Sequence, residues 1–230
     1  MCLIIHSETG DFANFENHLH STIKKNPHGW GFMALNKGKV LSGKFAKANM
    51  ADVLAICDRL YHMQSPAFIH FRLATSGEIS ETLAHPYKVG KGALMHNGIL
   101  PMKYEPPKNS KLNDTLTFIN THRDILGKIR TNTKAIADII GRNNKFAWLD
   151  SGGPLIVNRD SGIEYKGLWV SNTYAWDYKE SLYLDDIGNE DDIYDLILDY
   201  PEIAASLLEE AGYSRFDILD RVADEGGGLW

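Results

Sequence analysis

The sequence is poor in cysteine and has no long apolar run. Among its 230 residues only Cys2 and Cys57 are cysteines, a number too small for a disulfide framework or a zinc site of paired cysteines. Cys57 falls on the apolar side of a helical pattern, where we expect a core residue. No segment approaches the roughly 18 consecutive apolar residues of a membrane span, and the first residues lack the apolar core of a secretion signal. We therefore expect a cytoplasmic protein that does not enter a membrane.

The charge pattern argues against nucleic-acid binding and divides the chain in two. The net charge is −6, and no basic stripe is interleaved with aromatic residues. Residues 1–179 carry 22 Lys and Arg against 15 Asp and Glu, whereas residues 180–230 carry 2 against 15. We predict one domain at 1–179 and an acidic helical extension at 180–230, which docks on the body or on a basic partner.

Apolar periodicity predicts a mixture of strands and helices in the first part of the chain. Short apolar or alternating runs predict strands after Cys2 and at 30–36, 39–45, 67–72, 92–96, 146–149, 155–158 and 168–171. Helical spacing predicts helices at 11–25, 49–62, 113–127 and 133–141. Asn49 can cap the second of these helices, with Asp52 three residues on. Hairpin-connected strands with intervening helices favour layered α+β structure over an all-β barrel.

Cys2 is a candidate nucleophile because of its place in the chain. If Met1 is removed, which a small second residue permits, Cys2 carries both a thiol and a free α-amine. An α-amine titrates at roughly 7.7–8.0 and can accept the thiol proton, directly or through one water. The alternative is that Cys2 is simply a small apolar residue at the start of a strand.

Three further features supply what such a cysteine needs to cleave an amide. Asn97 and Gly98 end a strand with a side-chain amide next to a freely approachable backbone N–H, a pair suited to an oxyanion. Arg72 ends another strand and could fork onto a carboxylate, and Asp114 could pair with an ammonium group. Each has an ordinary alternative: a tight turn for Asn97-Gly98, a surface ion pair for Arg72 and a helix N-cap for Asp114.

Taken together, these motifs resemble a known family. They occur in the order Met1-Cys2, Pro27-His28-Gly29-Trp30-Gly31, His70-Phe71-Arg72-Leu73-Ala74-Thr75, Ala84-His85-Pro86-Tyr87, His96-Asn97-Gly98-Ile99 and Asn113-Asp114-Thr115. This order and spacing is similar to that of the class II glutamine amidotransferases of the N-terminal-nucleophile (Ntn) hydrolase superfamily, in their compact single-domain form. The resemblance covers residues 2 to 115, and His28 departs from it because the family turn usually has an aspartate there.

The resemblance implies a four-layer αββα sandwich of two antiparallel sheets between helices. It implies Cys2 as nucleophile with its own amine as general base, and an oxyanion hole made by Asn97 and the Gly98 N–H. Arg72 would hold the α-carboxylate of glutamine, Asp114 its α-ammonium group, and Thr75 would line the same pocket. His85 and His96 are expected to be structural.

The implied reaction converts glutamine to glutamate and ammonia. The acceptor of the ammonia is unknown, and a partner synthase that accepts it is possible. No cofactor is implied. A metal is not expected either, since His70, His85 and His96 are accompanied by neither a helical His-x-x-x-His pair nor clustered carboxylates. Two alternatives stay open at this point: an Ntn amidase that acts on another amide or a γ-glutamyl compound, and a catalytically idle binding module that uses its acidic tail.

Overall fold

The structure, a computed structural model, describes residues 1–74, 77–108 and 110–176. The predicted extension at 180–230, the predicted domain boundary at 179 and Thr75 lie outside these described residues. No helix in the described part of the chain is both long enough and apolar enough to cross a membrane.

Ten strands form two antiparallel sheets. The larger sheet has six strands in the order β3-β2-β4-β1-β10-β9. Its strands are β1 (Leu3–Ser7), β2 (Trp30–Asn36), β3 (Lys39–Phe45), β4 (Ala67–Phe71), β9 (Ile163–Tyr165) and β10 (Leu168–Val170). The smaller sheet has the order β5-β6-β7-β8. Its strands are β5 (Tyr87–Val89), β6 (Gly92–Asn97), β7 (Lys145–Asp150) and β8 (Gly153–Val157).

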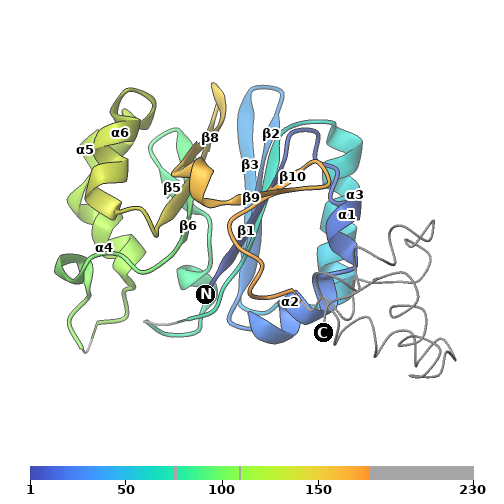
Figure 1. The fold of residues 1–230 in the computed structure, drawn as a ribbon, viewed down its shortest axis with the longest axis horizontal. Coiled ribbons are helices and arrows are strands. Elements are labelled where there is room, and N and C mark those ends of the chain that lie inside the picture. The colour runs from blue at the N-terminus through green and yellow to red at the C-terminus, as the bar shows by residue number, and fades with distance from the viewer. Residues whose placement is uncertain (75–76, 109, 177–230) are drawn as a thin grey trace, which may run out of the picture. The chain divides into compact units, whose positions relative to one another are not determined.

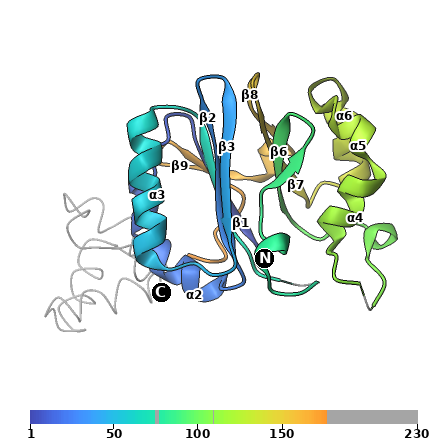
Figure 2. The ribbon, with the colours of Figure 1, turned by 180° about the vertical axis from the view of Figure 1, so that it is seen from behind.

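The helices fall into two groups, one for each sheet (Figures 1 and 2). The group beside the six-stranded sheet consists of α1 (Ala13–Glu16), α2 (Leu19–Lys25) and α3 (Met50–Met63). The group beside the four-stranded sheet consists of α4 (Asp114–Thr121), α5 (Arg123–Leu126) and α6 (Ile129–Ile140). Three short 3-10 helices, η1 (Glu81–Leu83), η2 (Met102–Tyr104) and η3 (Arg159–Ser161), lie in the connections.

Three hydrophobic clusters hold these elements together. One joins α1, α2 and α3 to the six-stranded sheet, one joins α4, α5 and α6 to the four-stranded sheet, and a third contains residues of both sheets. Strand β1 contributes to two of these clusters. Leu3 and Ile5 belong to the first cluster, and Ile4 between them belongs to the third. Successive side chains of a strand point to opposite faces, so β1 is buried on both sides. The predicted α+β class with two antiparallel sheets is confirmed.

Several predicted elements have different bounds in the structure. The helix predicted at 11–25 is two helices, and the buried His18 between them stacks on Trp176 with ring centroids 4.0 Å apart. The helix predicted at 113–127 is likewise divided, at His122. Strands β5 and β9 were not predicted; each has three residues and is defined by its pairing with a neighbouring strand rather than by local periodicity. The N-cap predicted at Asn49 is confirmed, because its Oδ1 accepts the Asp52 N–H at 2.9 Å.

Gly31 on β2 allows the loop before β5 to approach the sheet closely. A Cβ at this position would lie 2.1 Å from the carbonyl oxygen of His85 and 2.6 Å from that of Gly43. Both contacts are with backbone, so no side-chain rotation relieves them. The second glycine of the Pro27–Gly31 turn is therefore required by packing.

We predict that Gly31→Ala lowers the free energy of unfolding by about 2 kcal/mol or more, since overpacking against backbone forces strands apart. The control is Gly127→Ala, where the nearest atom to the added Cβ is 3.4 Å away. Urea unfolding followed by tryptophan fluorescence measures both variants. Equal stability of the two variants would contradict the close approach.

Candidate functional site

Cys2 lies directly before the central strand β1 and is half-buried. Its thiol donates to the carbonyl oxygen of Leu73, just beyond β4, with a sulfur–oxygen distance of 3.6 Å. Its own carbonyl oxygen accepts a hydrogen bond from Nδ2 of Asn172 at 2.8 Å. Burial raises the pKa of the Cys2 thiol, and the hydrogen bond to Leu73 together with the positive charges of the chain terminus and Arg72 offsets part of this effect. Such a thiol needs a base before it can act as a nucleophile.

One small pocket collects four of the predicted site residues. Its walls include Cys2, Arg72, Gly98 and Asp114, which come from four separate parts of the chain. The cavity measures about 20 Å³, with His85 and His96 also in its wall. Asn97 is not part of this wall, and Thr75 lies outside the described residues.

Arg72 is a buried cation rather than a surface residue. Its side chain is 3% exposed, and Nη1 donates to the carbonyl oxygen of Glu78 at 3.0 Å. Its backbone is fixed by the Pro27–Gly31 turn, because the Arg72 N–H donates to the carbonyl oxygen of Gly29 at 2.8 Å. The turn therefore places the guanidinium at the pocket.

His28 performs a specific task in this turn. Its side-chain Nδ1 accepts the backbone N–H of Ala74 at 3.0 Å, and the backbone N–H of His28 donates to the carbonyl oxygen of Arg72. A carboxylate oxygen at position 28 could likewise accept the backbone N–H of Ala74. An aspartate at position 28 could thus hold the segment after β4 as His28 does.

Asp114 opens helix α4 but does not cap it. The N-cap is Asn113, whose Oδ1 accepts the Leu116 N–H at 2.9 Å. The Asp114 carboxylate instead accepts the backbone N–H groups of Leu100 and Thr115, at 2.9 and 2.7 Å. An anion in the first turn of a helix is also favoured by the helix dipole. These contacts hold the carboxylate at the pocket.

Asn97 is buried at the end of β6 and meets the end of β10. Its Nδ2 donates to Oγ of Ser171 at 2.7 Å, and its Oδ1 has no partner among the described residues. The same Ser171 oxygen accepts the backbone N–H of Ile4 at 2.8 Å and is 3.4 Å from Nδ2 of Asn172. Strands β1, β6 and β10 are therefore joined at one hydroxyl group.

Asn144 lies so close to Gly98 that there is no room for a side chain at this position. A Cβ on Gly98 would lie 2.2 Å from Oδ1 of Asn144, and the φ of +139° also favours glycine. That oxygen accepts a hydrogen bond from Nε2 of His96 at 2.9 Å, and Nδ1 of His96 lies 2.8 Å from the hydroxyl of Thr115. His96 thus links β6 to α4 and to the segment before β7, in agreement with the structural role that was expected for it.

Three buried histidines, His70, His85 and His96, lie at the site. Burial lowers the pKa of His70 to about 3 and that of His85 well below its usual value. Burial also lowers the pKa of His96, although the nearby Asp114 acts in the opposite direction. The rings of His70 and His85 are 4.3 Å apart, and Nε2 of His70 donates to the carbonyl oxygen of His96 at 3.1 Å. All three side chains are neutral near pH 7 and carry no charge to the pocket.

Three residues of the site were not anticipated from the sequence: Ser171, Asn172 and Asn144. Ser171 is the last residue of the predicted strand at 168–171 and Asn172 follows it, and consecutive polar residues at a strand end were an available signal. Asn144 precedes a strand in an ordinary polar stretch, where no local pattern marks it. Within the described part of the chain, no group of three or more His, Cys, Asp or Glu is placed to hold a metal ion.

Comparison with solved structures gives a distant likeness. No protein-family model matches the chain, and no curated protein matches it. Among solved structures, the glutamine phosphoribosylpyrophosphate (PRPP) amidotransferase from B. subtilis, complexed with ADP and GMP, is similar with a TM-score of 0.46 and 17% sequence identity. The likeness covers 76% of this chain but only 42% of that one. It fixes neither the family nor the activity of this chain.

The buried histidines predict a loss of stability in acid. The pKa of His70 is about 3 in the folded chain and about 6.5 when unfolded, so between these values only the unfolded chain binds the proton. This contribution to stability is complete above about pH 6.5 and is lost as the pH falls. At pH 5 the loss of stability caused by His70 amounts to about 2 kcal/mol.

We therefore expect His70→Gln to lose about 2 kcal/mol less than wild type between pH 7 and pH 5 in urea unfolding. Glutamine can still donate to the His96 carbonyl. The exposed His62 supplies the control variant His62→Gln, which should follow wild type. An unchanged pH dependence in His70→Gln would show that His70 is not held neutral.

Proposed function

We propose that this protein hydrolyses the side-chain amide of glutamine, in the manner of a class II glutamine amidotransferase with Cys2 as the nucleophile. The observation that supports this most directly is the meeting of Cys2, Arg72, Gly98 and Asp114 at one pocket. A thiol, a cation, an oxyanion donor and an anion are the groups needed to cleave an amide that belongs to a zwitterionic amino acid. The finer fold assignment is part of the same proposal: the three hydrophobic clusters support a four-layer αββα sandwich of the Ntn type.

The proposed mechanism assigns one role to each residue. The α-amine of a Cys2 freed from Met1 takes the thiol proton, and the sulfur attacks the amide carbon of glutamine. The oxyanion that forms is held by the Asn97 amide and the Gly98 N–H. The ammonium proton of Cys2 passes to the leaving nitrogen, and ammonia departs from a γ-glutamyl thioester. Water then releases glutamate and restores the thiol.

Arg72 and Asp114 give the proposal its preference for a free amino acid. The guanidinium of Arg72 would hold the α-carboxylate, and the carboxylate of Asp114 would hold the α-ammonium group. Each oxygen of Asp114 already accepts a backbone N–H, but a carboxylate oxygen has two lone pairs and can accept a further donor. Thr75, which lies outside the described residues, keeps its proposed place beside the substrate.

The hydrogen-bond count at Ser171 supports an oxyanion role for Asn97. A serine hydroxyl has two lone pairs and one proton, yet N–H groups of Ile4, Asn97 and Asn172 all point at this oxygen. Exchanging the amide oxygen and nitrogen of Asn97 gives the serine proton an acceptor. The Asn97 NH₂ group then occupies the position that has no partner among the described residues. A buried donor in that state is suited to an oxyanion.

The proposal requires the pocket to be larger than it is with Met1 in place. A cavity of about 20 Å³ holds roughly one water molecule, not glutamine. Met1 is bonded to the Cys2 nitrogen, and its side chain is about half exposed. Removing Met1 frees the general base and removes a residue beside the nucleophile. The ammonia acceptor and any partner synthase remain part of the proposal without an assigned identity.

The first test is whether the mature protein begins with Cys2 and releases ammonia from glutamine. We expect intact-mass spectrometry to show loss of Met1, and Cys2→Ala to abolish ammonia release while leaving the urea unfolding midpoint close to wild type. Cys57→Ala is the matched control, since Cys57 is a core residue away from the pocket, and its activity should persist. Glutamine hydrolysis by a protein that retains Met1 would overturn the mechanism.

The second test asks whether Asp114 recognises the α-ammonium group. Asp114→Asn keeps the shape of the side chain but removes its charge, so we expect kcat/KM for glutamine to fall at least about tenfold, which corresponds to about 1.4 kcal/mol. For glutaramate, which is glutamine without its α-amino group, the same variant should differ little from wild type. Asp138→Asn, at an exposed site on α6, is the control. An equal loss on both substrates would favour an amidase for a different amide.

A further inference from the structure

A second cavity lies where three β-hairpins end, and we call it the hairpin cleft. It measures about 500 Å³, a size typical of small-molecule sites. The turns of the β2–β3, β5–β6 and β7–β8 hairpins contribute its walls, among them Lys39, Ser42, Lys88, Lys91, Ala93 and Ser151. All of its lining residues are described, and none of them is acidic.

The hairpin cleft is remote from the Cys2 pocket. Strand β6 begins in the cleft at Gly92 and ends beside the pocket at Asn97 and Gly98. Five residue steps of an extended strand span roughly 17 Å at about 3.3 Å per residue. The two cavities therefore lie toward opposite ends of the same strand, and a molecule in the hairpin cleft does not touch the proposed nucleophile.

The lysines of the cleft lack counterions. None of Lys39, Lys88 and Lys91 forms an ion pair within the described part of the chain. Lys88 alternates along β5 with Tyr87 and Val89, whose side chains pack in the cluster beneath α4 to α6. Its own side chain therefore points the other way, toward the six-stranded sheet. Like charges gathered in a cleft attract an anion and raise its local concentration.

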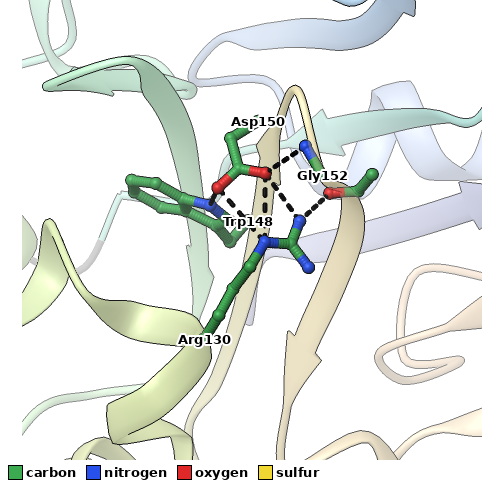
Figure 3. A network of polar contacts seen from close by, with 5 residues as sticks. Arg130, Trp148, Asp150 and Gly152 are labelled. Atoms are coloured by element: carbon green, nitrogen blue, oxygen red, sulfur yellow. Dashed lines mark hydrogen bonds and ion pairs between the residues drawn. The ribbon is translucent and has the colours of Figure 1, made fainter.

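The carboxylate of Asp150, in the third hairpin, is paired with a cation. Figure 3 shows Asp150, at the end of β7, bound by the guanidinium of Arg130 from α6. Trp148 Nε1 and the Gly152 N–H, each at 2.8 Å, also donate to this carboxylate. The network holds the β7–β8 turn and pairs the Asp150 carboxylate with Arg130, so this carboxylate does not compete with an anion for the cleft lysines.

The floor of the cleft is apolar. Ala93 belongs to the hydrophobic cluster between the two sheets, and Val40 packs against that cluster. The cleft thus combines an apolar floor, the hydroxyls of Ser42 and Ser151 and a rim of lysines. Lysine binds phosphate well as a point charge, and an apolar floor suits the organic part of a ligand rather than a bare ion.

We propose that the hairpin cleft binds a phosphate monoester that carries an apolar organic group. The lysines hold the phosphate, and the organic group lies on Val40 and Ala93. The site is independent of the proposed hydrolysis, because it shares no residue with the Cys2 pocket.

The experiment is calorimetric titration of the full chain with phenyl phosphate, inorganic phosphate and phenol. We expect phenyl phosphate to bind tighter than inorganic phosphate, and phenol to bind weakest. The double variant Lys88→Gln/Lys91→Gln should weaken phenyl phosphate binding at least about tenfold, with unchanged ammonia release. The control Lys134→Gln removes an exposed lysine on α6 and should bind as wild type does.

Three results would overturn the proposal. The first is no saturable binding of phenyl phosphate by wild type up to about 10 mM, roughly tenfold above a weak Kd of about 1 mM. The second is an equal loss in Lys134→Gln, which would show a general response to charge. The third is undiminished binding of phenyl phosphate by the soluble fraction of the double variant. If that variant also aggregates, the role of Lys88 on the edge strand β5 is to prevent pairing with other chains.

Discussion

The hydroxyl group of Ser171 is the contact on which the candidate site depends. It accepts the N–H of Ile4 from β1, lies at the end of β10 and meets Asn97 from β6. One oxygen therefore joins the six-stranded sheet to the four-stranded sheet, beside the residue proposed as nucleophile. Asn172 continues this connection by holding the Cys2 carbonyl. The start of the chain is fixed in three dimensions by residues that lie about 170 positions away in sequence.

Neutral histidines supply the buried polar groups beside Arg72. The interior beside Arg72 needs polar groups that orient strands and loops, but another cation there would repel the guanidinium. His70, His85 and His96 are buried, and burial keeps them uncharged. Arg72 is therefore the cation of the pocket wall and Asp114 its anion. An arrangement with one charge of each sign is what a zwitterionic substrate would require.

The sequence predicted the parts of the fold that depend on local pattern. The β2–β3 hairpin has the predicted bounds, and the Asn49 cap follows from a side chain three residues before its donor. Long-range contacts were not predictable in this way: β5 and β9 are defined by pairing with neighbouring strands, and His18, where the predicted helix is interrupted, stacks on the distant Trp176. At the site, motif order identified Cys2, Arg72, Gly98 and Asp114, but the partners Ser171, Asn172 and Asn144 emerge only when strands are brought together.

The layer between the sheets separates two chemically different ends of the molecule. Ile4, Met95 and Ala147 are fully buried within it, so a ligand in the hairpin cleft has no open route through this layer to Cys2. Strand β6 connects the two ends, and its pairing with β5 and β7 fixes its register. A ligand can alter the other site only if it binds two states of the protein differently. A phosphate monoester held at the lysines would therefore affect the proposed amide hydrolysis only if it favoured one of two states of the elements, β6 among them, that connect the cavities; otherwise the two sites would work separately.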